Sequence, residues 1–271
     1  MEAEVSAQRV LFVTVGTTAI RPELGETGTD HRRLQATLAT FKKRADGRSA
    51  AELDALGGNA IFADVVRAHA EVLELGIGDW PDYLGNLSAE MTSTHFLAAH
   101  PESRFGGVLD GNRVRIVLLA SDTAAGLFCA HVNASLLHRF LVWPGCTCGT
   151  RFEDFTGNWG CPAVRVRVVP GMEARRLRKV HESLRGVCLS EAGDRAQIVF
   201  NITGGYKGAV PAITWLAFHD FGGRAELFYQ HESALAATRF AFLPSTDDGS
   251  RADRTPLSGL RLEETVWINH P

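Results

Sequence analysis

Apolar and polar positions follow two patterns along the chain. Runs rich in β-branched and aromatic residues predict strands at residues 9–15, 113–120, 163–169, from 197 up to Asn201, and 224–230, with further strands at 238–243 and 260–268. Apolar residues at helical spacing predict helices at 30–43, 48–56, 60–75, 88–99, 124–140 and 172–184, and another beside Lys207. This alternation indicates an α/β fold with a mostly parallel sheet flanked by helices.

Composition excludes several classes of protein. The net charge is −3, so no basic field covers the surface, and we expect no binding of long duplex nucleic acid. The first nine residues do not resemble a signal peptide, and no apolar run approaches the length of a membrane span. Five cysteines in 271 residues do not resemble a disulfide framework. We therefore expect a cytoplasmic protein with no membrane contact.

The segment 197–215 carries the clearest candidate chemistry. An apolar run meets Asn201 and Thr203, breaks at Gly204 and Gly205, and restarts beside Lys207 as a helix. Glycines let an anion approach the backbone amides, the helix N-terminus adds partial positive charge, and a lysine adds a full one. The pattern matches neither the Walker loop nor the dinucleotide fingerprint. It is compatible with a phosphate site or with a plain tight turn and a solvated lysine.

Two other predicted strands also end in polar loops. The first is followed by Gly16-Thr17-Thr18 and the second by Ser121-Asp122-Thr123. The carboxyl ends of parallel strands meet at one edge of a sheet, where ligands of α/β proteins usually bind. We therefore group these loops with the glycine loop as one candidate site.

These segments together resemble the CARF domain, the CRISPR-associated Rossmann fold that binds cyclic oligoadenylate messengers in type III CRISPR immunity. Asn201-Ile202-Thr203-Gly204-Gly205-Tyr206-Lys207 is similar to its Asn-x-Thr-Gly-Gly-Phe/Tyr-Lys hallmark. The segments that resemble its other motifs, in order, are Val15–Thr18, Ser88–Glu90, Ser121–Gly126, Leu227–Glu232 and Leu243-Pro244. The resemblance implies one Rossmann-like CARF domain over residues 1–244, with an irregular cysteine-containing insertion at about 143–162 and a C-terminal extension at 245–271.

A stand-alone CARF domain is similar to the ring nucleases, which cleave the cyclic tetra-adenylate that they bind. That similarity implies metal-independent attack by a ribose 2′-oxygen on the neighbouring phosphorus, with no cofactor. Lys207 would stabilise the transition state, and the Thr18 hydroxyl would position the 2′-oxygen or the phosphate. Thr replaces the family's usual Ser at position 18, and the β-branched side chain has a stiffer rotamer.

A near-symmetric ring fits a two-fold axis, so the resemblance also implies a homodimer. Tyr206 suits either stacking on adenine or packing in the core. The expected ligand-binding residues are Gly16, Thr17, Ser121, Asp122, Thr123, Asn201, Thr203, Gly204, Gly205 and Tyr206.

Two alternative functions share this fold. The protein could be a non-catalytic sensor that sequesters the messenger or regulates a partner. It could also be a ligand-activated effector ribonuclease, although only a short segment follows Pro244, too short for a separate nuclease domain. Arg176 and His181 have the spacing of a HEPN nuclease pair, but they fall on a basic helix that more simply forms a solvated face.

A cysteine cluster raises the question of metal binding. Cys146, Cys148 and Cys161 lie in the predicted insertion, with Cys129, His131 and His138 upstream. A structural zinc site normally has four ligands at more regular spacing. We therefore predict thiols without a bound metal.

Overall fold

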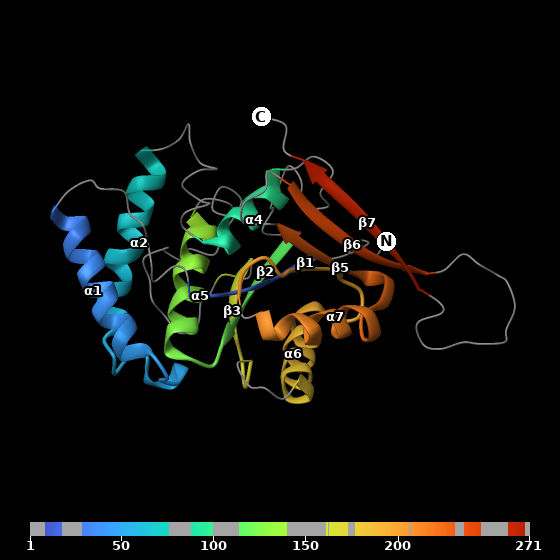
Figure 1. Ribbon diagram of the computed structural model, residues 1–271, viewed down its shortest axis with the longest axis horizontal. Coiled ribbons are helices and arrows are strands. Elements are labelled where there is room, and N and C mark those ends of the chain that lie inside the picture. Colours follow the sequence, from blue (N-terminus) through green and yellow to red (C-terminus); the bar gives the residue numbers. More distant parts are fainter. Residues whose placement is uncertain are drawn as a thin grey trace, which may run out of the picture.

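The computed structural model describes residues 9–17, 29–75, 88–99, 114–139, 161, 163–172, 177–205, 207–230, 236–244 and 260–268. In this part of the chain one seven-stranded sheet has the order β3-β2-β1-β4-β5-β6-β7 (Figure 1). The strands are β1 (Arg9–Thr14), β2 (Val114–Ser121), β3 (Val164–Val169), β4 (Gln197–Asn201), β5 (Ala225–Gln230), β6 (Ala236–Pro244) and β7 (Leu260–Ile268). The seven strands predicted from the pattern are confirmed.

The first five strands run parallel, and β6 and β7 continue the sheet antiparallel. The order 3-2-1-4-5 is that of a doubly wound, Rossmann-like fold, so the predicted fold class is confirmed. In register, Thr14 of β1 lies opposite Leu119 of β2, and Val13 lies opposite Asn201 of β4. Strand order reverses between β1 and β4, so the crevice between their following loops is where such folds bind ligands.

Helices cover both faces of the sheet. They are α1 (Thr29–Ala45), α2 (Gly58–Leu75), α4 (Ala89–Ala99), α5 (Ala124–Leu137), α6 (Leu177–Ala192) and α7 (Val210–His219), with short 3₁₀ turns η2 (Ala50–Glu52), η5 (Lys207–Ala209) and η6 (Gly222–Arg224). Figure 1 shows α6 and α7 together on one side of the sheet, and α1 and α2 side by side beyond α5. Within the described ranges, no helix combines the length and apolar character that crossing a membrane requires.

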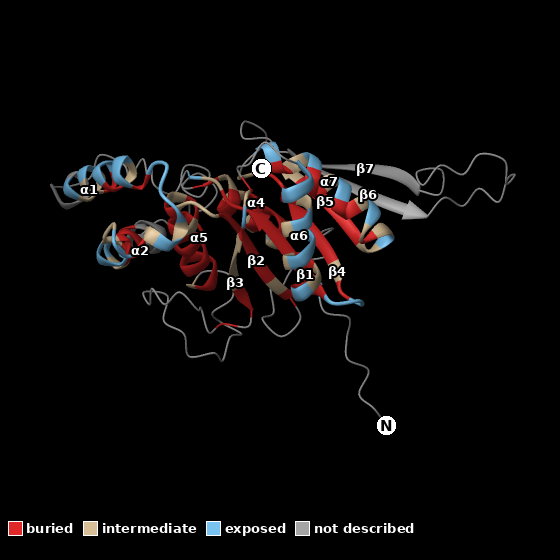
Figure 2. Ribbon diagram, turned by 90° about the horizontal axis from the view of Figure 1, so that it is seen from below, coloured by how far each residue is buried: buried red, intermediate tan, exposed pale blue. Residues whose placement is uncertain are grey.

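Alternation along the central strands builds two cores. Leu11 and Val13 belong to the cluster that includes α4 and α5, whereas Val10 and Phe12 belong to the cluster that includes α6 and α7. Each of these four side chains is fully buried. A strand covered on both faces needs apolar residues at every position, which explains the unbroken run in β1 (red in Figure 2).

Two predicted helices differ from the observed ones. The stretch 48–56 forms only the 3₁₀ turn η2, which Ser49 and Glu52 close as a capping box. Helix α6 continues to Ala192 instead of ending near residue 184, because apolar positions at Val180, Leu184 and Cys188 keep facing the core beyond the glycine at 186.

The buried carboxylate of Glu191 links α6 to β2 and β3. The Glu191 side chain is 2% exposed and pairs with Arg115 of β2 at 3.5 Å, Arg165 of β3 at 3.1 Å and Arg167 of β3 at 2.5 Å. Burial, followed by repulsion from Arg165, lowers the pKa of Arg115. The alternating arginines of β3 thus face a specific partner, and Glu191 links β2, β3 and α6.

Burial of His131 in α5 predicts that the stability of the folded protein depends on pH. Burial lowers the pKa of His131 from 6.5 to about 4, so this imidazole stays neutral in the folded protein down to that pH. The unfolded chain takes up the proton below pH 6.5, so stability is complete above that pH and falls as the pH decreases towards 4. The expected loss from this residue is about 2 kcal/mol at pH 5.

Urea denaturation at pH 7.5 and pH 5 measures this loss. The variant His131→Gln should lose about 2 kcal/mol less than the wild type between the two pH values. Ala39→Gln, at an exposed position of α1, adds no titratable group and should keep the wild-type pH dependence. Equal pH dependence of wild type and His131→Gln would contradict the prediction.

Candidate functional site

Two loops meet at the switch point of the sheet. One follows β1 and contains Gly16 and Thr17; the other follows β4 and contains Gly204, Gly205 and Lys207. A Cβ on Gly16 would lie 3.3 Å from the amide nitrogen of Gly205, so the backbones are in close contact. The structure therefore brings together the first-strand loop and the glycine loop, as the sequence predicted.

A carboxylate from α4 holds the two loops together. Ser88 caps the helix by accepting a hydrogen bond from the amide of Met91 at 3.1 Å, which places Glu90 in the first turn. Glu90 is 1% exposed, and its Oε1 accepts a hydrogen bond from the amide of Gly16 at 2.5 Å. A Cβ on Gly204 would lie 2.6 Å from Cγ of Glu90. The Glu90 side chain therefore occupies the space that a Cβ at position 204 would need.

Position 205 is a glycine for a different reason. Gly205 has φ +84°, a conformation that residues with a side chain rarely adopt. A Cβ there would also lie 2.6 Å from Cβ of Thr14. The Thr14 hydroxyl donates a hydrogen bond to the carbonyl of Gly204 at 2.6 Å, which ties the loop to the end of β1. The glycine pair is thus set by close packing on both sides of the loop.

Asn201 and Thr203 fix the start of the glycine loop through buried hydrogen bonds. Asn201 is fully buried; its Nδ2 donates to Ser93 Oγ at 2.7 Å, and its Oδ1 accepts from the amide of Thr203 at 3.1 Å. Thr203 is 3% exposed, and its hydroxyl oxygen accepts from the amide of Gln230 at 2.9 Å. Both side chains therefore hold the loop in place. Direct binding of a ligand by either one stays a prediction.

Lys207 is the exposed cation of this loop. Its Nζ donates to the carbonyl of Thr203 at 3.3 Å and lies 5.5 Å from the ring centroid of Tyr229. Among the described residues, nothing accepts a hydrogen bond from the amides of Gly204 or Gly205. Amide donors, a fixed ammonium group and the N-terminal end of the helical segment that leads into α7 together favour an anionic ligand.

The loop after β2 has mainly structural partners. Ser121 and Thr123 share a hydrogen bond of 2.8 Å, and Thr123 caps α5 by accepting from the amide of Gly126 at 3.2 Å. The Asp122 carboxylate accepts from the amide of Gly171 at 2.9 Å, and Ser49 forms an isolated bridge with Thr123. This loop stands at the same sheet edge, but its polar groups are engaged within the protein.

Several predicted residues lie outside the described residues, namely Thr18, Tyr206, Arg176, Cys146 and Cys148. His181 is described, and its Nε2 lies 3.1 Å from Asp220 Oδ2 on the α6–α7 side. Cys129, upstream of the predicted insertion, and Cys161, within it, are buried and form no disulfide in the described part of the chain. Within the described ranges no three His, Cys, Asp or Glu side chains come together as metal ligands.

Comparison with known families identifies the chain's relatives. The model of a family described as "CRISPR-associated protein (Cas_APE2256)" matches residues 86–240, which is more than half of the chain. The protein belongs to this CRISPR-associated family. No curated protein matches the sequence. The matched segment contains Glu90, the β2 loop, the glycine loop and Lys207, whereas β1, α1 and α2 precede it.

Sequence reasoning missed three residues of this CRISPR-associated protein's site. Glu90 drew attention as part of a helix start and not as the group that joins two loops. Thr14 lies in the predicted strand 9–15, and Tyr229 lies in the predicted strand 224–230 and in the motif Leu227–Glu232. The Ser88-Ala89-Glu90 motif was the available signal for Glu90, but its partner Gly16 is distant in sequence.

Proposed function

We propose that this CRISPR-associated protein is a CARF-type ring nuclease that binds a cyclic oligoadenylate, most readily cyclic tetra-adenylate, and opens it. The carrying observation is the convergence of Gly16, Gly204 and Gly205 at the switch point, beside the exposed Lys207. Family membership supports a role in CRISPR immunity. The resemblance of the glycine loop to the CARF hallmark supports a cyclic oligoadenylate as the anionic ligand.

The proposed reaction needs alignment and charge stabilisation. A ribose 2′-oxygen attacks the adjacent phosphorus and forms a 2′,3′-cyclic phosphate, while the bond from phosphorus to the 5′-oxygen breaks and that oxygen leaves as a hydroxyl. The proton of the 2′-hydroxyl passes to solvent, and solvent protonates the leaving oxygen. Lys207 and the loop amides stabilise the negative charge that develops on the phosphoryl oxygens. Thr18 is proposed to orient the 2′-oxygen or the phosphate.

A homodimer is part of the proposal. A ring with near two-fold symmetry can contact the same loops from two copies related by a two-fold axis. Each copy would supply Thr17, Gly204, Gly205 and Lys207, so that positive charge approaches the ring from both sides.

A sensor without cleavage is the second candidate. One observation favours it: the carbonyl of Thr203 holds Lys207, and the side chains of Asn201 and Thr203 are buried and bonded within the protein. Such a loop suits phosphate binding without supplying a proton-transfer group. A ligand-activated ribonuclease is the third outcome that the assay distinguishes.

The test is an incubation with radiolabelled cyclic tri-, tetra- and hexa-adenylate in EDTA, with an unrelated linear RNA in parallel. Linear product from cyclic tetra-adenylate, ending in a 2′,3′-cyclic phosphate, is the expected result. Intact ring that migrates with the protein would favour the sensor, and RNA cut only when a ring is present would favour the effector. If no ring binds or is cut, the assignment of the site to cyclic oligoadenylates is wrong.

A further inference from the structure

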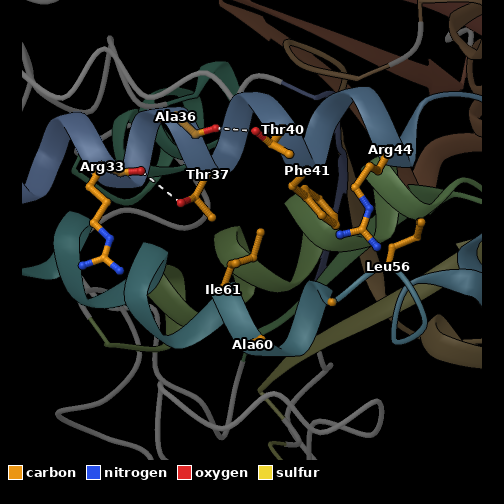
Figure 3. Close-up of a pocket in the computed structure, with 10 residues that line it drawn as sticks. Arg33, Ala36, Thr37, Thr40, Phe41, Arg44, Leu56, Ala60 and Ile61 are labelled. Carbon is orange, nitrogen blue, oxygen red and sulfur yellow. Dashed lines mark hydrogen bonds between the residues drawn. The ribbon is translucent and has the colours of Figure 1, made fainter.

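A second concave surface lies between α1 and α2, in the part of the chain before the family match. The cavity has a volume of about 460 Å³ (Figure 3). Neither α1 nor α2 carries a residue of the switch-point site. The residues that line it are Arg33, Ala36, Thr37, Thr40, Phe41, Arg44, Leu56, Gly57, Ala60 and Ile61.

The floor of this cavity is apolar and firmly supported. Phe41 is 3% exposed and packs against Phe128 of α5, with ring centroids 4.7 Å apart. The hydroxyls of Thr37 and Thr40 donate to carbonyls of their own helix, at 3.0 Å and 2.9 Å, so neither hydroxyl needs a partner in the cavity. Phe41 thus supports the floor from the core, and the threonine hydroxyls beside it are already satisfied.

The side chains at the edges of this cavity are small enough to let another backbone approach. Ala36 and Ala60 are exposed and Gly57 is partly exposed, and such small residues allow helices to pack closely. The α1 residues on the cavity recur at positions 33, 36, 37, 40, 41 and 44, which is the spacing of one helix face over three turns. The cavity, called the α1–α2 trough from here on, extends along three turns of α1. This shape fits a third helix better than it fits a compact small molecule.

Two cations mark the ends of the trough. Arg33 and Arg44 extend from α1 towards α2 at opposite ends (Figure 3). In the described part of the chain no acidic side chain pairs with either guanidinium. The two positions are 11 residues apart in α1, a rise of roughly 16 Å. Two carboxylates three turns apart on one face of a docked helix would match them.

We propose that the α1–α2 trough binds an amphipathic helix of a partner protein whose apolar stripe is flanked by acidic residues about three turns apart. The apolar stripe lies on Leu56 and Ile61, and the flanking carboxylates pair with Arg33 and Arg44. Charge complementarity selects the partner, and burial of its apolar stripe supplies affinity. This interaction is independent of ring cleavage.

The test uses a fluorescein-labelled helical peptide of about 16 residues with an apolar stripe and two glutamates eleven residues apart. A matched peptide carries lysines at those two positions. Fluorescence anisotropy should show binding of the glutamate peptide to the full chain, and about tenfold weaker binding of the lysine peptide. The double variant Arg33→Glu/Arg44→Glu should reverse this preference.

A second variant tests the trough without changing charge. Ala60→Trp places a large side chain at an exposed position on its wall and should weaken the glutamate peptide by about tenfold, with an unchanged melting temperature. Three results would overturn the proposal: no binding of the glutamate peptide, equal affinity for both peptides, or an unchanged preference in the charge-reversed variant. A dimer that sedimentation shows to dissociate on charge reversal would assign the trough to a second copy instead.

Discussion

Lys207→Ala is expected to slow the opening of cyclic tetra-adenylate by about 100- to 1,000-fold, or roughly 3–4 kcal/mol of transition-state stabilisation. The ammonium group is the exposed cation of the glycine loop, and its placement depends on the carbonyl of Thr203. In the proposed reaction negative charge grows on the phosphoryl oxygens during attack, so the ammonium group would stabilise the transition state more than the ground state. Single-turnover kinetics with radiolabelled ring in EDTA measure the effect.

The matched control is Lys179→Ala, which removes an exposed lysine from α6. This variant should cleave the ring at the wild-type rate, and both variants should keep the wild-type melting temperature because neither lysine is buried. Ring binding by Lys207→Ala, measured by filter retention, should fall less than turnover. Unchanged turnover in Lys207→Ala would refute the catalytic assignment, and a fall in binding alone would favour the sensor.

The architecture of the sheet followed from local sequence because burial on both faces leaves a simple pattern. Runs such as Val10–Val13 are apolar at every position, and each ends at a polar or glycine-containing loop. The strand order and the antiparallel pairing of β6 with β7 depend on contacts across the chain, which no local pattern specifies. The length of α6 was underestimated because an exposed glycine interrupts an otherwise continuous apolar face.

The sequence predicted which loops form the site, but not the contacts that hold them. The glycine loop and the Gly16 loop could be placed together because both follow parallel strands. The neighbouring sequence does not explain the glycines. A Cβ at position 204 would clash with Glu90 and one at position 205 with Thr14, and both partners are distant in sequence. A carboxylate in a first helical turn also has an ordinary explanation in the helix dipole, and that explanation conceals the bond from Gly16 to Glu90.

Gly204→Ala is therefore expected to damage both stability and ligand binding. The added Cβ would overlap the Glu90 side chain, which is 1% exposed and bonded to the amide of Gly16. Overpacking together with loss of the hydrogen bond from Gly16 to Glu90 should cost about 4 kcal/mol of unfolding free energy. Affinity for cyclic tetra-adenylate should fall at least about tenfold, because the two loops separate. Urea denaturation and ring-binding titrations measure the two effects.

Two further variants isolate the cause. Gly186→Ala adds the same methyl group to α6, where nothing lies within 4 Å of the new Cβ, and should stabilise the protein by about 0.5–1 kcal/mol. In a Glu90→Ala background the clash is absent, so Gly204→Ala should then cost less than about 1 kcal/mol. A large remaining cost in that background would mean that the backbone of the glycine loop, and not the Glu90 side chain, excludes a residue with a Cβ at position 204.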